Sequence, residues 1–130
     1  MFGIKLSDIH TVYHASNHLF TKPDIDMINK NRVNHQNGML GLFFSTTQNK
    51  WFHGFGKHIY EIEIPKHFRP FVMSLKDFHN LSMKVTDETY KEIREQLLEQ
   101  GVDYILIEES DDTIGMGVFI NLDIEIRLQQ

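Results

Sequence analysis

Histidine is the residue type that first suggests chemistry in this chain, with eight copies in 130 residues. His10, His14 and His18 recur every four residues, a spacing that would put three imidazoles on one face of a helix and so favour zinc. Residues 11–13 between them are β-branched and aromatic, and they favour a strand, where this interval does not bring the rings together. No His-Glu-x-x-His motif is present. We therefore predict no metal site and keep zinc binding only as a third hypothesis for the function.

Other familiar catalytic patterns are missing from the sequence. The chain has no cysteine, which excludes disulfides, thiolate metal ligands and a thiol nucleophile, and fits a reducing compartment. No Gly-x-Ser-x-Gly elbow and no glycine-rich phosphate loop of the Walker or Rossmann type occurs.

The strongest functional signal comes from separated segments that occur in a fixed order. They are Tyr13-His14-Ala15-Ser16, Gly41-Leu42-Phe43-Phe44-Ser45-Thr46, Phe55-Gly56-Lys57-His58-Ile59-Tyr60-Glu61-Ile62, Gly101-Val102-Asp103-Tyr104-Ile105 and Val118-Phe119-Ile120-Asn121. The first three resemble the Tyr-His-Gly-Ser/Thr, Gly-Leu-Tyr-Phe-Thr and Tyr-Gly-x-x-Val-Tyr-Glu-Val segments of the ADP-ribosyltransferase superfamily, and the last two are similar to the closing strands of its small phage and bacterial toxin-like members. The resemblance extends from about residue 12 to residue 126.

The resemblance implies an α+β fold: a split β-sandwich of two antiparallel or mixed sheets with flanking helices, and NAD as co-substrate in the cleft between the sheets. It assigns His14 to a ribose hydroxyl of NAD, and the backbone of Ala15 to the nicotinamide amide. Phe43 and Phe55 would enclose the nicotinamide ring, because a flat ring favours aromatic faces. Ser45 would offer a hydroxyl nearby. The same segments place Tyr13, Ser16, Gly41 and Phe44 among the NAD-binding residues, although one of the adjacent pair Phe43 and Phe44 belongs in the core, since strand neighbours point to opposite faces.

Two departures from the family pattern bear on catalysis. Phe43 stands where many members have tyrosine. Met116 and Gly117 occupy the position of the usual catalytic glutamate, whose loss typically lowers the rate about 10²–10³-fold. The acidic residues Glu108, Glu109, Asp111 and Asp112 are candidates to replace it if the turn that carries them folds back, and we select Glu109.

Hydrophobic patterning predicts the elements that must position these residues. We expect strands over residues 11–14, 39–45, 59–64, 104–107 and 117–122, with a last strand within 124–128. For residues 39–45 periodicity alone does not exclude a helix. We expect helices from Pro23 to Asn29 and from Thr86 to Gln100; the second would be capped by Thr86, end at Gly101 and bury Tyr90, Ile93, Leu97 and Leu98. Residues 29–38 are predicted as a loop, 51–56 as a short helix or a loop, and Asp111-Asp112 as a turn.

Composition predicts one globular domain over residues 1–130. The net charge of −5 and the lack of a basic run disfavour nucleic acid as a general partner, while a local basic patch formed by folding stays open. No apolar run approaches the ~18 residues of a membrane span, and the first residues lack a signal-peptide core. We expect a cytoplasmic protein, in the producing or the infected cell.

The resemblance therefore predicts an enzyme that transfers ADP-ribose from NAD to a macromolecular target, with a protein as the expected acceptor, in the manner of a toxin or phage effector. The alternative is an inactive member of the family that binds and inhibits a protein partner, and the missing glutamate motivates it.

Overall fold

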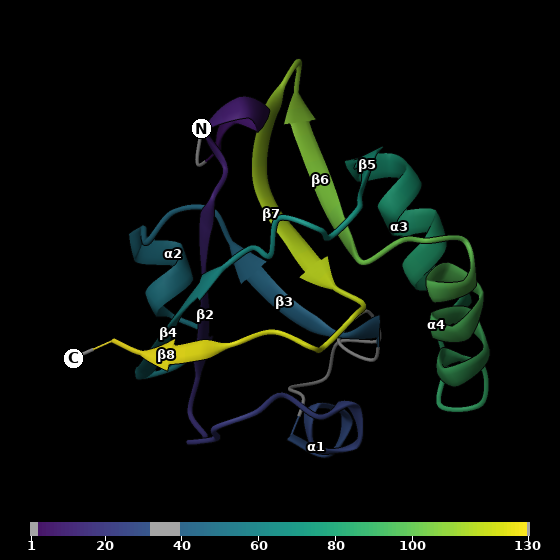
Figure 1. Cartoon of the computed structure of the whole chain (residues 1–130), viewed down its shortest axis with the longest axis horizontal. Coiled ribbons are helices and arrows are strands. Elements are labelled where there is room, and N and C mark those ends of the chain that lie inside the picture. Colours follow the sequence, from purple (N-terminus) through teal and green to yellow (C-terminus); the bar gives the residue numbers. More distant parts are fainter. Residues whose placement is uncertain (1–2, 32–39, 130) are drawn as a thin grey trace.

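The computed structural model describes residues 3–31 and 40–129. Figure 1 shows its β-strands at the centre, with α3 and α4 together on one side and α2 on the opposite side. In chain order the elements are β1 (Ile4–Lys5), a 3-10 turn (Leu6–Asp8), β2 (Thr11–Ser16), α1 (Ile25–Asn31), β3 (Leu42–Ser45), α2 (Lys50–His53), β4 (His58–Glu63), β5 (Pro70–Ser74), α3 (Leu75–Lys84), α4 (Tyr90–Glu99), β6 (Tyr104–Ser110), β7 (Thr113–Phe119) and β8 (Ile126–Leu128).

The described strands form one hydrogen-bonded sheet in the order β5-β6-β7-β3-β2-β4-β8, and β1 pairs with the start of β7. The β5–β6 pair is parallel, and the other pairs are antiparallel. This arrangement confirms the mixed α+β class. The prediction of two separate sheets was wrong, because the described strands belong to a single hydrogen-bonded sheet.

The sheet nevertheless has very little backbone pairing between two of its neighbouring strands. β2 and β3 share a single register pair, Tyr13 with Ser45, whereas β2 pairs with β4 along its whole length. The sheet is thus divided into two halves, β5-β6-β7-β3 and β2-β4-β8, joined at this one pair.

One hydrophobic core is built from side chains of both halves. Val12 of β2 and Ile62 of β4 belong to the same buried cluster as Phe44, Leu106 and Phe119 of the other half. Both halves of the sheet therefore contribute side chains to one core.

A second core lies on the opposite face of the β5-β6-β7-β3 half. Ile105, Ile107 and Val118 are buried there together with Phe78 of α3 and Val85. Alternation along β6 explains the division, since Tyr104 and Leu106 contribute to the first core and Ile105 and Ile107 to the second.

The α4 prediction is confirmed with two corrections. Regular helix begins at Tyr90, because residues 87–89 form a turn that Thr86 caps: its Oγ1 accepts the Glu88 and Thr89 N–H groups at 3.2 Å. Tyr90, Ile93 and Leu97 pack on the second core, but Leu98 is 40% exposed. Helical geometry turns Leu98 by about 100° from Leu97 and so out of the apolar stripe.

Sequence patterning did not predict β1, β5 or α3. The signal for α3 is short and polar: the Ser74 hydroxyl caps the helix by accepting the Asp77 N–H at 3.1 Å. β5 lies at the sheet edge, and its first residue is Pro70, which cannot donate to a ladder.

Helix α1 is shifted from the predicted span. It begins after Asp24, whose Oδ1 accepts the N–H groups of Asp26 and Met27 at 2.9 and 3.1 Å, and continues to Asn31, two residues beyond the predicted end. Most of the predicted 29–38 loop and residue 39 of the strand predicted over residues 39–45 lie outside the described residues. That strand begins at Leu42.

Candidate functional site

The site that the sequence predicts around His14 lies where β2 and β3 separate. Beyond the Tyr13–Ser45 pair the two strands share no further register pair. There the His14 Nδ1–H donates to the Phe43 carbonyl at 2.5 Å. A side chain thus bridges the strands where the main-chain ladder stops.

This bond fixes the chemistry of the imidazole. A carbonyl oxygen only accepts, so Nδ1 carries the proton and Nε2 of the neutral ring is left as an acceptor. Burial lowers the pKa of His14, and the bond to the Phe43 carbonyl opposes this only in part. His14 is therefore a neutral acceptor at physiological pH, suited to a hydroxyl donor.

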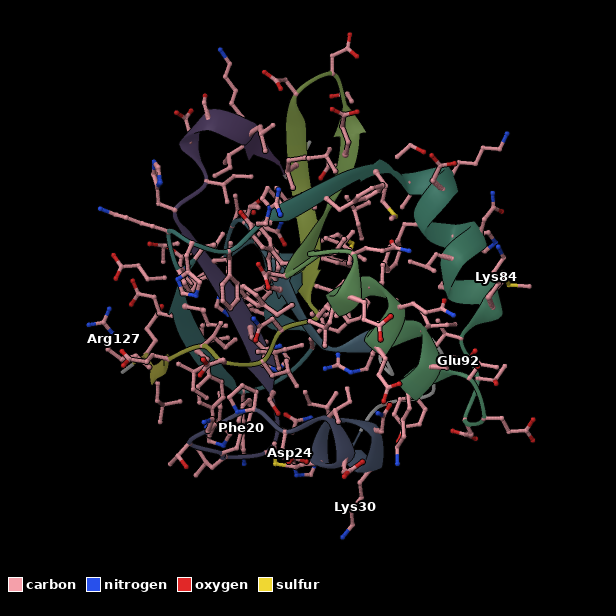
Figure 2. The ribbon with its side chains drawn as sticks, turned by 45° about the vertical axis from the view of Figure 1, so that its right-hand side comes forward. Phe20, Asp24, Lys30, Lys84, Glu92 and Arg127 are labelled. Atoms are coloured by element: carbon pink, nitrogen blue, oxygen red, sulfur yellow. The ribbon has the colours of Figure 1, made fainter. Side chains whose placement is uncertain are left out.

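Two aromatic rings beside His14 were missed as site residues. Phe20 contacts the His14 ring edge-on at a centroid distance of 5.9 Å, and Tyr60 lies 6.3 Å from it and 4.5 Å from Phe20. The Tyr60 hydroxyl accepts the Phe20 N–H at 2.9 Å and donates to the His18 carbonyl at 3.3 Å. Figure 2 shows Phe20 on the segment between β2 and α1. Tyr60 belongs to the family-like segment of residues 55–62, but no local sequence pattern indicated Phe20.

Ala15 and Ser16 occupy the last part of β2 and bond to β4 through one edge only, opposite Ile59 and His58. The chain at Gly56 comes so close that a Cβ there would lie 2.4–2.6 Å from the Ser16 backbone. Only glycine permits this approach. The Phe55-Gly56 motif and the Tyr13–Ser16 motif, 40 residues apart, are thus adjacent in space.

The predicted aromatic pair, Phe43 and Phe55, has other ring partners in the structure. Phe43 is half-buried on the second core and contacts Phe78 of α3 edge-on at 5.9 Å. Phe55 is 49% exposed and contacts Trp51 of α2 edge-on at 4.8 Å. The two rings therefore pack on different helices, Phe43 on α3 and Phe55 on α2.

Three other predicted residues serve mainly the framework. Phe44 is buried in the first core, so its side chain leaves the candidate site. The Ser45 hydroxyl is buried and donates to the Thr47 carbonyl at 2.7 Å. Gly41 packs against β7, where a Cβ would collide with the Phe119 carbonyl.

The position of the missing glutamate is apolar in space as well as in sequence. Met116 pairs with Ser45 of β3 and Ile107 of β6, and its side chain packs on the second core. Its neighbour Gly117 leaves room for the Phe44 ring, which a Cβ would meet at 2.4 Å. Neither residue brings a charge to the site.

The turn with the acidic candidates does fold back along β7. The Glu109 Oε1 lies 1.6 Å from where a Cβ of Gly115 would be, so this carboxylate occupies the space of a missing side chain on β7. Gly115 is the extra residue of a β-bulge, because Ile114 pairs with Glu108 and Met116 with Ile107. The Glu109 carboxylate therefore lies beside Gly115, the residue that precedes Met116.

The other acids of the turn are directed elsewhere or stay at the tip. Glu108 Oε2 accepts the Asp112 N–H at 3.2 Å. Asp111 and Asp112 are exposed, and Asp112 has the left-handed φ of 62° that a tight turn requires. The predicted turn at Asp111-Asp112 is confirmed.

Metal ligation finds no support in the described part of the chain, where no group of three or more His, Asp or Glu side chains could hold an ion. No helix in residues 3–31 and 40–129 has the length and apolar character needed to traverse a bilayer.

No protein-family model, curated protein or solved structure matches the sequence or the fold.

Proposed function

We propose that this protein has an ADP-ribosyltransferase-like fold and binds NAD at the β2–β3 opening, by which we mean the place beyond Tyr13 and Ser45 where the two strands stop pairing. It transfers ADP-ribose from NAD to a macromolecule in the cytoplasm. The observation that carries the proposal is the bond from His14 Nδ1 to the Phe43 carbonyl at the point where the strands separate. It leaves Nε2 ready to accept from a ribose hydroxyl, beside Ala15, which is half-buried.

An aromatic ring is available beside the Tyr13–Ser16 segment. Phe55 is half-exposed there, next to Gly56, which packs on the Ser16 backbone, whereas the Phe43 ring is packed on α3. The nicotinamide ring would stack on Phe55, whose orientation is fixed by Trp51.

Departure of nicotinamide leaves positive charge on the ribose, and a nearby anion lowers the energy of that transition state. We assign this role to Glu109, because its carboxylate is folded over Gly115 while Glu108 bonds within its own turn. The nicotinamide–ribose bond breaks, its electron pair leaves with nicotinamide, and the acceptor nucleophile then bonds to the ribose carbon and loses its proton.

A second candidate function is favoured by the packing of Met116. An apolar side chain on the second core at the family's glutamate position fits an inactive member that binds and inhibits a protein partner. The two functions differ in turnover and not in fold.

The deciding experiment measures NAD hydrolysis and transfer of labelled ADP-ribose for the wild type and for Glu109→Gln, with Glu108→Gln, Asp111→Asn and Asp112→Asn as matched controls. We expect a loss of about 10²–10³-fold for Glu109→Gln alone. Wild-type rates in all four variants would remove the acidic turn from the mechanism. An inactive wild type that gains turnover as Met116→Glu would favour the binding protein; Gly117→Glu is unsuitable, because a side chain there collides with Phe44 and the Ile105 carbonyl.

A further inference from the structure

Charge is distributed very unevenly along the chain. Residues 9–60 contain five lysines or arginines and only two acids, Asp24 and Asp26, whereas residues 61–130 contain seven lysines or arginines and fifteen acids. No acid occurs in residues 9–23 or 27–60. Residues 9–60 are therefore basic, although the whole chain has a net charge of −5.

Folding brings two of these acid-free segments together. Gly56 packs on the Ser16 backbone, and the Lys57 N–H donates to Asn17 Oδ1 at 3.1 Å. Lys50, His53 and Lys57 are all exposed in this region. Figure 1 places α2, where the region begins, on the side of the molecule opposite to α3 and the acid-rich α4.

Two large aromatic rings are exposed within the same stretch. Trp51 is 48% and Phe55 49% exposed, and their rings meet edge-on at 4.8 Å. About half of each side chain is exposed, so both rings offer aromatic surface to a ligand. We call Lys50, Trp51, His53, Phe55 and Lys57 the aromatic platform.

We propose that the aromatic platform binds single-stranded nucleic acid, and that this is the macromolecular partner of the proposed transferase. Exposed aromatic faces accept unpaired bases, while lysines beside them neutralise phosphates. Because the proposed function assigns Phe55 to nicotinamide, Trp51 is the ring that stacks on a base when NAD is bound. The choice of a nucleic acid over an acidic protein rests on the rings, because charge complementarity alone would fit both. The acidic remainder of the chain would repel the strand and confine it to this surface.

The inference rests on the proposed function for its role in transfer, but the binding itself is testable without NAD. Trp51 is the chain's single tryptophan, so its fluorescence reports on the platform alone. Titration of the full chain with a thymidine 12-mer at low salt should quench this fluorescence saturably, and a uridine 12-mer tests RNA in the same way.

Matched variants distinguish base stacking from nonspecific hydrophobic binding. Binding of a fluorescein-labelled 12-mer is measured by fluorescence anisotropy. Trp51→Ala and Phe55→Ala should each weaken binding about five-fold or more. Phe71→Ala, equally exposed at 48% but on β5, should not. Lys50→Gln with Lys57→Gln should reduce the slope of log affinity against log salt by about 1.4, whereas Lys76→Gln with Lys84→Gln on α3 should leave it unchanged.

Lack of quenching by both oligonucleotides, or equal losses in the Phe71 and Trp51 variants, would overturn the proposal. Quenching by poly-glutamate but not by oligonucleotide would also overturn it and assign the surface to an acidic protein. Oligonucleotide binding without NAD binding would refute the proposed transferase and leave the platform standing, and the reverse result would refute the platform alone.

Discussion

His14 and Phe43 are joined by a 2.5 Å hydrogen bond from the imidazole Nδ1 to the main-chain carbonyl, across the gap where β2 and β3 cease to pair. The bond has two consequences. It ties the two halves of the sheet together beyond their single register pair, and it holds a neutral imidazole with a free acceptor atom at the opening.

The first prediction concerns the pH dependence of stability. Because the folded pKa of His14 is lowered by burial, the unfolded chain binds a proton below pH ~6.5 that the folded chain does not. The stability present above that pH is lost as the pH falls toward the folded pKa, by up to about 1.4 kcal/mol per pH unit. Urea unfolding between pH 7.5 and 5.5 should therefore show a steeper loss for the wild type than for His14→Gln. Parallel curves would mean that His14 protonates equally in both states.

The second prediction tests the orientation of α4. Leu97 packs on the second core while half-buried, so Leu97→Ala should lower the free energy of unfolding by about 1–3 kcal/mol. Leu98→Ala on the same turn, with a 40% exposed side chain, should change it by less than about 0.5 kcal/mol. Equal effects in chemical denaturation would show that the helix faces differently.

The third prediction uses a glycine to move a carboxylate. In Gly115→Ala the new Cβ would meet the flexible end of Glu109, so the carboxylate is displaced while the backbone is not strained. NAD hydrolysis should fall at least about ten-fold, in the direction of Glu109→Gln, with little change in melting temperature. An unchanged rate alongside a strongly impaired Glu109→Gln variant would show that Glu109 acts from another position.

The sequence predicted the elements whose signals are local. Alternation in residues 59–64 gave β4, and the Thr86 cap with the apolar stripe gave α4 to within a turn. β5 and α3 were missed because β5 is a short edge strand with Phe71 and Val72 exposed, and α3 buries only Phe78. An apolar pattern is weak where one residue carries the packing.

The candidate site was predictable only in part. Family-like motifs indicated His14, Phe43 and Phe55, but their contacts depend on distant segments: Phe20 reaches His14 through a bond to Tyr60, 40 residues away. The fold-back of Glu109 depends on a bulge at Gly115, which a strand pattern does not reveal.

Calorimetric titration of the wild type and of His14→Ala with NAD tests the central claim most directly. The wild type should bind with a dissociation constant in the micromolar to millimolar range, roughly −8 to −4 kcal/mol. His14→Ala should weaken binding by about 1–3 kcal/mol, because a ribose hydroxyl loses its acceptor. Neither heat nor a thermal shift from the wild type at several millimolar NAD, with the fold intact, would contradict the account.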